Sequence, residues 1–284
     1  MMDLCDINQI KALLARHGFH FSKSMGQNFL IADWVPREIA KAAGAHPDVG
    51  VLEIGPGIGC LTRELAGRAG KVVSVELDRS LLPILEETLT DRDNVEIVSG
   101  DILKLDIRQT TLEMPWLSGF AACANLPYNI TTPAITALIE AQCFFAITVM
   151  IQKEVAQRIC AQPGSKDYGA FSVYCQYYTA PELLFEVPPD CFIPAPKVTS
   201  AVVRMVPRPA PPEVDDPAHF FRVVKAAFAL RRKTLLNSLS AGLGGQREEI
   251  AQAIAACGLP PDVRGERLSI PQFAQLSRRL RGSV

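Results

Sequence analysis

The chain has 284 residues, a formal net charge of −1 and 48% hydrophobic residues. This length favours one large domain with a smaller one, and the composition excludes an intrinsically disordered chain. No apolar run approaches the roughly 20 residues of a membrane-spanning helix, and the first residues lack a secretory or transit signal, so we expect a cytoplasmic protein.

The first two-thirds of the chain alternates short, β-branched apolar runs with helical patterns. Strands are predicted at 49–54, 71–77, 95–99, 120–124 and 145–152, and helices at 61–68, 80–89 and 133–141. Strand–helix–strand units of this length build a mostly parallel sheet covered by helices. Two more strands, 182–187 and 200–206, follow without an intervening helix and predict an antiparallel pair at the sheet edge.

A proline-rich segment from Pro207 to Pro212 is typical of a stiff linker. We therefore predict one domain at 1–209 and a second at 210–284. The second domain is expected to be all-helical, with helices at 217–230, 232–239, 247–257 and 271–280.

Charge is divided unevenly between the two predicted domains. From His219 to the end, eleven basic and four acidic residues give +7, which leaves −8 for the rest of the chain. A basic helical domain favours a polyanion-binding face, although an ordinary solvated helical surface gives the same pattern.

The eight cysteines are scattered singly, without a Cys-x-x-Cys pair, and the four histidines show no ligand spacing. The sequence therefore predicts no metal site and no disulfide framework, and most thiols are expected to be small core residues.

Three glycines, Gly55, Gly57 and Gly59, stand at alternate positions where the first predicted strand turns into a helix. Glycines there let the backbone turn tightly and approach a ligand, and the helix that follows presents free N–H groups. A dinucleotide fingerprint starting at Gly55 would need glycine at position 60, where Cys60 stands. With Glu53 leading directly into the loop, the pattern favours S-adenosylmethionine over a pyrophosphate ligand.

Acidic residues follow the next two predicted strands. Glu76 closes the second strand, where a carboxylate can accept both hydroxyls of a ribose. Asp101 follows the third strand and is placed to accept from the adenine amine of the donor, whereas Asp78 is expected to cap a helix. Taken singly, each acid could equally be a surface carboxylate or a cap.

Asn125-Leu126-Pro127-Tyr128 follows the fourth predicted strand. We interpret this motif as one that serves methylation of the exocyclic amine of a target adenine. That amine is a poor nucleophile because its lone pair is delocalised into the ring. Acceptors on the Asn125 side chain and the Leu126 carbonyl would favour a tetrahedral amine, and Pro127 holds Leu126 extended. Tyr128 can stack on the base, with Phe192 as a second aromatic face, although Phe192 could be a core residue and the tetrapeptide a structural turn.

Together with residues 24–30, 152–156, 192–200 and 231–237, these motifs resemble the ribosomal RNA adenine dimethyltransferase family, in its small-subunit branch. The resemblance implies an α/β class I methyltransferase fold, Rossmann-like with a seven-stranded sheet, and a small helical domain that binds RNA. It implies that Asn28 and Leu30 contact S-adenosylmethionine alongside Gly55, Glu76, Asp101 and Asn125. No metal is expected.

The resemblance also implies a substrate. Two adjacent adenosines near the 3′ end of 16S rRNA would each receive two methyl groups in an immature small (30S) subunit, as a step of ribosome biogenesis, and we expect a monomer. RNA contacts are expected from Lys23, Lys153, Arg231, Arg232 and Lys233. Ser22 stands where lysine is usual and would weaken one phosphate contact, and Met25 replaces a usual leucine.

Two other functions are compatible with part of this sequence. A 23S rRNA methyltransferase of the antibiotic-resistance type shares the adenine chemistry, but the amino-acid sequence of residues 152–156 and 231–237 favours the small-subunit branch. A non-catalytic nucleic-acid-binding protein could use the same fold, but Glu76, Asp101 and the tetrapeptide are intact.

Overall fold

The computed structural model describes residues 2–22, 25–112, 117–209, 212–230 and 232–281. The chain forms two compact units: one comprises Met1–Ala156 and Glu182–Pro207, and the other comprises Gln157–Pro181 and Arg208–Val284. The second unit begins again at Arg208, close to the predicted boundary after residue 209. It also contains residues 157–181, which the sequence analysis placed in the first domain.

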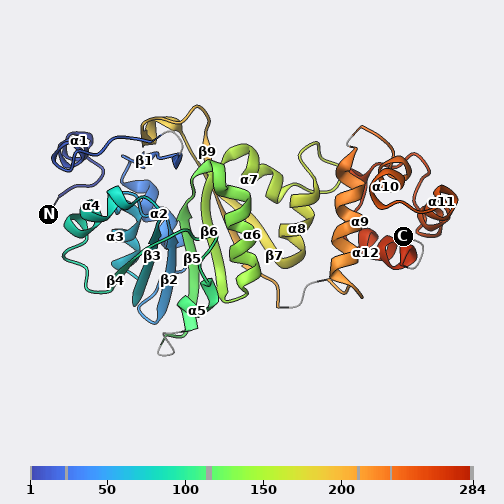
Figure 1. Ribbon diagram of the computed structural model, residues 1–284, viewed down its shortest axis with the longest axis horizontal. Helices are drawn as coiled ribbons and strands as arrows, with labels where there is room; N and C mark the ends of the chain where they lie inside the picture. Colours follow the sequence, from blue (N-terminus) through green and yellow to red (C-terminus); the bar gives the residue numbers. More distant parts are fainter. Residues whose placement is uncertain (1, 23–24, 113–116, 210–211, 231, 282–284) are drawn as a thin grey trace. The chain divides into compact units, whose positions relative to one another are not determined.

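The first unit is built on a seven-stranded sheet with the order β4-β3-β2-β5-β6-β9-β7 (Figure 1). The strands from β4 to β6 run parallel, and β9 runs antiparallel to β6. The mostly parallel sheet with a reversed strand near one edge is therefore confirmed. The strands are β2 (Val49–Ile54), β3 (Lys71–Glu76), β4 (Val95–Ser99), β5 (Gly119–Asn125), β6 (Phe144–Gln152), β7 (Thr179–Val187) and β9 (Ser200–Pro207).

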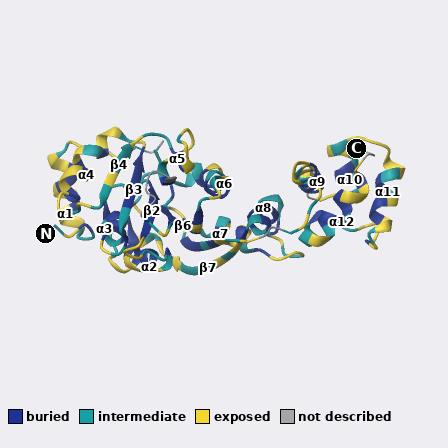
Figure 2. Cartoon of the chain, turned by 90° about the horizontal axis from the view of Figure 1, so that it is seen from below, coloured by how far each residue is buried: buried dark blue, intermediate teal, exposed yellow. Residues whose placement is uncertain are grey.

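Burial explains why these segments are strands. Every residue of β2 is buried, as are all residues of β3 except the first, as their colour in Figure 2 shows. Such long buried runs, mostly apolar, are typical of central parallel strands covered on both faces. A separate two-stranded sheet pairs β1 (Phe29–Leu30) with β8 (Phe192–Ile193) and was not predicted from the sequence.

Helices of the first unit include three that the sequence predicted within a few residues and others that it did not. The predicted helices correspond to α3 (Cys60–Ala66), the segment of η2 (Arg79–Leu81) with α4 (Leu82–Thr88), and α6 (Thr131–Ala141). The unpredicted ones are α1 (Ile7–Arg16), α2 (Trp34–Ala42), α5 (Ile107–Leu112) and α7 (Lys153–Cys160), whose end enters the second unit.

The second unit is helical, with its own hydrophobic core. Aromatic side chains of α8 (Ala170–Tyr178) pack on α9 (Pro217–Ala229); the rings of Tyr177 and Phe220 lie 5.2 Å apart. This packing is the physical reason that residues 157–181 group with the helical unit. The other helices are α10 (Leu235–Leu243), α11 (Arg247–Ala256) and α12 (Ile270–Leu280).

The start of α10 differs from the prediction, which began this helix at residue 232. The Thr234 hydroxyl accepts a hydrogen bond from the Asn237 N–H at 3.4 Å, so Thr234 is the N-cap. Arg232 and Lys233 therefore precede the helix. Across the described ranges, no helix combines the length and apolar character needed to cross a membrane.

Candidate active site

A cavity lies at the carboxyl ends of the parallel strands, where ligands bind in open α/β sheets. The loops after β2, β3, β4 and β5 line it, together with the segment around β1. All six residues expected to contact the methyl donor line this one cavity: Asn28, Leu30, Gly55, Glu76, Asp101 and Asn125.

The glycine loop between β2 and α3 has the conformation that its spacing predicts. Gly55, Gly57 and Gly59 have φ values of 67°, 60° and 92°, in the left-handed region that side chains disfavour. A Cβ atom at Gly57 would lie 3.2 Å from the Phe29 ring. The loop is fixed to the neighbouring strand because the Gly55 N–H donates to the Val75 carbonyl at 3.0 Å.

Glu76 ties the glycine loop to the end of β3. Its carboxylate is 6% exposed and accepts hydrogen bonds from the backbone N–H groups of Asp78, at 2.8 Å, and Gly57. Burial raises the pKa of Glu76, and these backbone donors partly oppose that rise. A buried acceptor that faces a cavity suits hydroxyl donors on a ligand.

Two aspartates stand beside Glu76, with different surroundings. Asp101 lines the cavity; its Oδ1 accepts from the Leu103 N–H at 3.0 Å, and the exposed Lys104 ammonium lies 3.8 Å from Oδ2. Asp78 caps η2 by accepting from the Ser80 N–H at 3.0 Å, which confirms the predicted capping role.

The segment before β1 is bound to the rest of the cavity wall. The Asn28 carbonyl accepts from the Asn125 amide at 3.3 Å, and the Asn28 amide donates to the Gly26 carbonyl at 3.1 Å. Gln27 Nε2 donates to Asp78 Oδ2 at 2.6 Å. Sequence reasoning missed Gln27; its only signal was its place in the segment that carries the family resemblance.

The tetrapeptide leaves β5 in an extended conformation. The Leu126 N–H donates to the Met150 carbonyl at 3.1 Å, so the ladder between β5 and β6 continues past Asn125. Pro127 has φ −55° and ψ 132°, after which the chain turns. The Tyr128 hydroxyl hydrogen-bonds with Ser200 Oγ at 2.7 Å, while burial raises its pKa.

Phe192 lies elsewhere than the sequence analysis expected. Its side chain is 3% exposed and belongs to the hydrophobic core, and it is not among the described residues that line the cavity. Its backbone adjoins the cavity wall because Phe192 pairs with Leu30 between β8 and β1. In this conformation Phe192 is a core residue, which was the alternative interpretation of its sequence position, because the apolar side chain packs inward from the strand.

Glu53 is also buried away from the cavity lining. The carboxylate is 1% exposed and accepts a hydrogen bond from the Ser74 hydroxyl at 2.6 Å. Burial raises its pKa to about 7, although hydroxyl groups of Ser74 and Thr62 oppose the shift. Glu53 therefore acts inside the sheet, behind the glycine loop.

The basic residues expected to contact RNA have different surroundings. Lys153 is paired with Glu186, with Nζ 2.8 Å and 2.9 Å from the two carboxylate oxygens. Arg232 and Lys233 are exposed before α10. Lys23 and Arg231 lie outside the described residues.

Residues 18–281 match a family described as ribosomal RNA adenine dimethylase. The chain belongs to the ribosomal RNA adenine dimethylase family. Members of this family use S-adenosylmethionine to dimethylate adenines of ribosomal RNA, so the predicted enzyme class is confirmed.

Curated relatives match nearly the whole chain. A Geobacillus kaustophilus protein named ribosomal RNA small subunit methyltransferase A is 48% identical over 98% of this chain and 97% of its own length. A Streptococcus pneumoniae protein of the same name is 47% identical over 99% of each chain. These names favour the small-subunit branch over the large-subunit alternative.

Two solved structures share the fold. The 23S rRNA methyltransferase ErmE aligns with a TM-score of 0.67 and 30% identity, covering 89% of this chain and all of its own. A Plasmodium falciparum dimethyladenosine transferase aligns with a TM-score of 0.72 and 22% identity, covering 89% of this chain and 98% of its own. The predicted class I methyltransferase fold is confirmed.

Proposed function

We propose that this protein methylates N6 of two adjacent adenosines near the 3′ end of 16S rRNA, twice each, in an immature 30S subunit. It acts as a monomer in the cytoplasm. The observation that carries the proposal is the contact between the Asn125 side chain and the Asn28 backbone at the wall of the donor cavity. This contact joins the acceptor motif to the segment assigned to the donor.

The residues of the cavity fit S-adenosylmethionine, which supplies a methyl group on a sulfonium centre when bound. Glu76 offers a buried carboxylate for the ribose hydroxyls, and Asp101 offers an acceptor for the donor's adenine amine. Among the described residues, a Cβ atom at Gly55 would have a single neighbour within 4 Å, Pro127 Cδ at 3.9 Å, so this face of the loop leaves room for the methionine part. Asn28 and Leu30 line the same cavity.

The tetrapeptide orients the acceptor amine. Because Asn125 Nδ2 is engaged by the Asn28 carbonyl, Oδ1 is the atom of that amide left to accept an N–H from the base. The Leu126 carbonyl accepts the second N–H, and Leu126 is 1% exposed and held between β5 and Pro127. Both acceptors draw the amine toward a tetrahedral geometry that frees its lone pair, and positioning supplies the rate enhancement.

No side chain is needed as a general base. After methyl transfer the cationic nitrogen is acidic, so its proton leaves to water. Tyr128 stacks on the target base, with its hydroxyl held by Ser200. The second stacking partner, Phe192, must turn out of the core beside Leu30 when RNA binds.

RNA binding rests on exposed cations of the helical unit. Arg232 and Lys233 precede α10 without a carboxylate partner in the ion pairs of the described residues. Lys23, Lys153 and Arg231 complete the proposed contacts, and RNA must compete with Glu186 for Lys153. Each phosphate contact adds to the salt dependence of binding.

The proposal is tested by incubating the protein and radiolabelled donor with immature 30S, mature 30S, 50S and free 16S RNA. We expect label in immature 30S, on two adjacent adenosines. The Asn125→Ala variant should lose at least about 100-fold in turnover, as when one oriented polar group is removed from an active site, while its affinity for the donor falls far less. Labelling of 50S alone refutes the substrate, and full activity of the variant refutes the role of Asn125.

A further inference from the structure

Two thiols from distant parts of the chain meet beside the donor cavity. Cys5 precedes α1, and Cys60 is the first residue of α3. Cys60 Sγ lies 2.9 Å from the carbonyl oxygen of Leu4, whose carbonyl carbon is bonded to the Cys5 nitrogen. The Cys60 side chain is also the largest cause that lowers the pKa of Cys5. Cys60 Sγ therefore adjoins the peptide group that joins Leu4 to Cys5.

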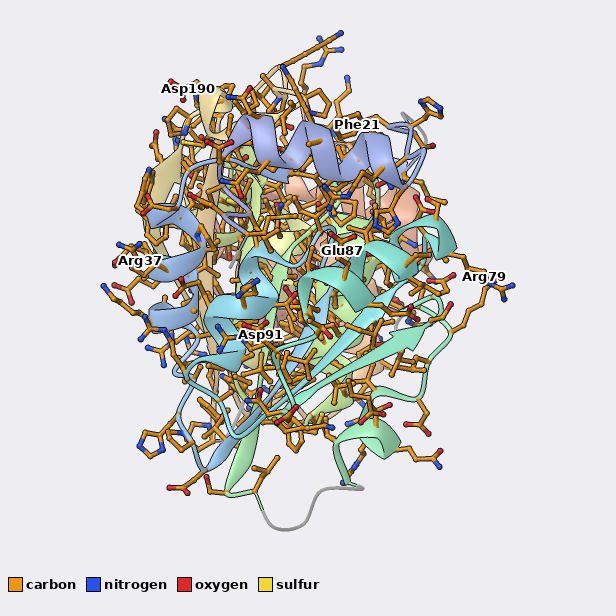
Figure 3. The ribbon with its side chains drawn as sticks, turned by 90° about the vertical axis from the view of Figure 1, so that its left-hand side faces the viewer. Phe21, Arg37, Arg79, Glu87, Asp91 and Asp190 are labelled. Atoms are coloured by element: carbon orange, nitrogen blue, oxygen red, sulfur yellow. The ribbon has the colours of Figure 1, made fainter. Side chains whose placement is uncertain are left out.

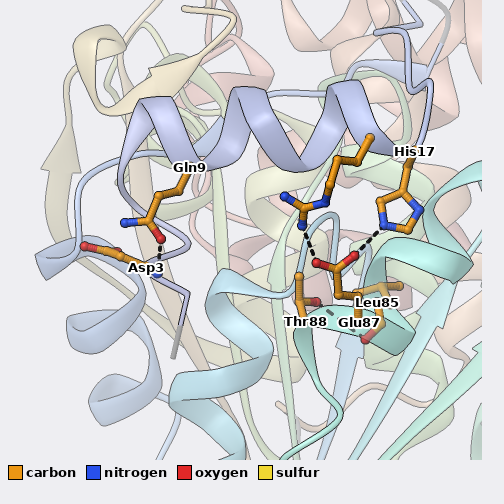
Figure 4. A network of polar contacts seen from close by, with 7 residues as sticks. Asp3, Gln9, His17, Leu85, Glu87 and Thr88 are labelled. Atoms are coloured by element: carbon orange, nitrogen blue, oxygen red, sulfur yellow. Dashed lines mark hydrogen bonds and ion pairs between the residues drawn. The ribbon is translucent and has the colours of Figure 1, made fainter.

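The turn that carries Cys5 is held in place at several points. The Cys5 N–H donates to Asp3 Oδ1 at 2.8 Å, and the Asp3 N–H donates to Gln9 Oε1 at 2.9 Å (Figure 4). The Leu4 side chain is 5% exposed and packs in the hydrophobic core. The meeting of the two thiols is thus part of an ordered turn.

The far end of α1 is fixed as well. Glu87 of α4 accepts from His17 Nε2 at 2.7 Å, as the close view in Figure 4 shows, and it also pairs with Arg16. Figure 3 shows the same helix lying above the labelled Glu87. Since both ends of α1 are anchored to the first unit, Cys5 stays close to Cys60.

Cys60 belongs to the wall of the donor cavity. It directly follows Gly59, the last glycine of the loop, and it lines the cavity itself. Its Sγ also lies 3.6 Å from the carbonyl oxygen of Leu30, one of the residues assigned to the donor. A change in the bonding of Cys60 is therefore transmitted to two parts of this wall.

We propose that Cys5 and Cys60 form an oxidisable pair, in which a peroxide converts the two thiols to a disulfide that weakens methyl-donor binding. The effect on the donor rests on the function proposed above, whereas formation of the disulfide does not.

The chemistry proceeds in two balanced steps. The Cys5 thiolate attacks one peroxide oxygen, the O–O bond breaks, and Cys5 becomes a sulfenic acid as the peroxide is reduced to water. Cys60 sulfur then attacks the Cys5 sulfur, the S–O bond breaks, and hydroxide leaves with the Cys60 proton as a second water. Two thiols and one hydrogen peroxide give one disulfide and two waters, and a thiol reductant reverses the change.

The surroundings assign the order of attack. Cys5 is partly exposed and has the lowered pKa, so it supplies the thiolate that meets the peroxide. The neighbouring Cys5 side chain, together with burial, raises the pKa of Cys60. Cys60 therefore keeps its proton and serves as the resolving thiol.

The disulfide changes the donor site because an S–S bond of about 2.05 Å has strict torsional demands. Cys60 Sγ must leave the carbonyls of Leu4 and Leu30, and the first turn of α3 must adjust beneath the glycine loop. A coupling typical of two linked sites corresponds to a rise of about tenfold in the donor dissociation constant. By the same linkage, bound donor shifts the equilibrium of the pair toward the two reduced thiols by the same factor.

The full chain is treated with stepwise hydrogen peroxide, alkylated, digested without reductant and mapped by mass spectrometry. Donor binding is measured calorimetrically before oxidation, after oxidation and after added thiol. We expect a Cys5–Cys60 peptide, a donor dissociation constant raised about tenfold in the oxidised protein, and recovery with thiol. The variant Cys5→Ser should bind the donor with the affinity of the parent protein, and peroxide should leave that affinity unchanged.

The matched control is Cys257→Ser, which removes a partly buried thiol of the helical unit and should behave as the parent protein. Oxidation that joins other cysteines, or that stops at sulfinic acid on Cys5, overturns the thiol pair. A Cys5–Cys60 disulfide with unchanged donor affinity overturns the effect on binding. If the reduced protein binds no donor, the function proposed above fails, while the peptide map still decides whether the pair forms.

Discussion

Gln27 Nε2 donates to Asp78 Oδ2 at 2.6 Å, while Gln27 Oε1 accepts from the Ser22 N–H at 3.0 Å. One side chain thus links the segment before β1 to the turn after β3, across 51 positions of sequence. Neither residue was assigned to the donor by the sequence analysis. The geometry makes Gln27 a positioning residue that holds the Asn28 segment against the cavity.

Replacing Gln27 with Ala should weaken donor binding about tenfold, because a hydrogen bond to a charged group is worth about 1.5–3 kcal/mol and part of that holds the segment in place. Gln27→Glu should weaken donor binding further, since it places a second carboxylate against that of Asp78. Calorimetry with the donor tests both, and Asp78→Asn combined with Gln27→Glu should recover part of the loss. Equal donor affinity in all variants would show that this bridge does not position the segment.

Two substitutions of Tyr128 distinguish stacking on the base from the hydrogen bond of its hydroxyl group. Tyr128→Phe keeps the ring and loses only the bond to Ser200, so activity should fall less than tenfold, with a loss of about 1 kcal/mol in the free energy of unfolding. Tyr128→Ala removes the ring, and stacking is worth about 1–3 kcal/mol per base. We expect its RNA dissociation constant to rise far more than that of Tyr128→Phe. Steady-state kinetics and urea unfolding distinguish the two effects, and identical kinetics for the variants would exclude stacking.

The role of Gly57 in the donor-binding loop can be tested by comparison with Gly18, a glycine with the same φ outside that loop. Gly57 and Gly18 both have φ 60°. A Cβ atom at Gly57 would meet the Phe29 ring, whereas at Gly18 it would have no neighbour within 4 Å in the described part of the chain. Each Ala variant should lose about 1–2 kcal/mol of stability for the left-handed conformation. Only Gly57→Ala should also weaken donor binding, because its loop position is fixed by the bond to Glu76. If Gly18→Ala weakens donor binding to the same extent, the effect is global and not local.

Glu53 gives the folded protein a pH-dependent stability. Its pKa rises from 4.5 to about 7 through burial, so the folded state prefers the protonated form. Stability from this group is present below pH 4.5 and is lost as the pH rises toward 7, by about 3 kcal/mol in total. Glu53→Gln has no charge to bury. Its stability advantage over the parent should therefore grow between pH 5 and 7 and then level off, as measured by urea unfolding at several pH values. An advantage independent of pH would show that folding does not raise the pKa of Glu53.

The sequence by itself determined the parallel sheet, the glycine loop and the motif at the end of β5. These features depend on local rules: continuous apolar runs make buried strands, and glycines at alternate positions allow positive φ. The carboxyl ends of parallel strands meet at one edge, so Glu76, Asp101 and Asn125 could be placed together without a structure.

Tertiary structure decided the contacts between segments that no local pattern relates. Packing of α8 on α9 moved residues 157–181 into the helical unit, and pairing of β8 with β1 buried Phe192. Gln27 is hydrogen-bonded to Asp78, and Cys60 contacts the turn that carries Cys5. In the sequence, Cys60 was notable only because it interrupts a glycine fingerprint. A side chain's partner across such distances depends on how whole elements pack, and composition and periodicity carry no record of that packing.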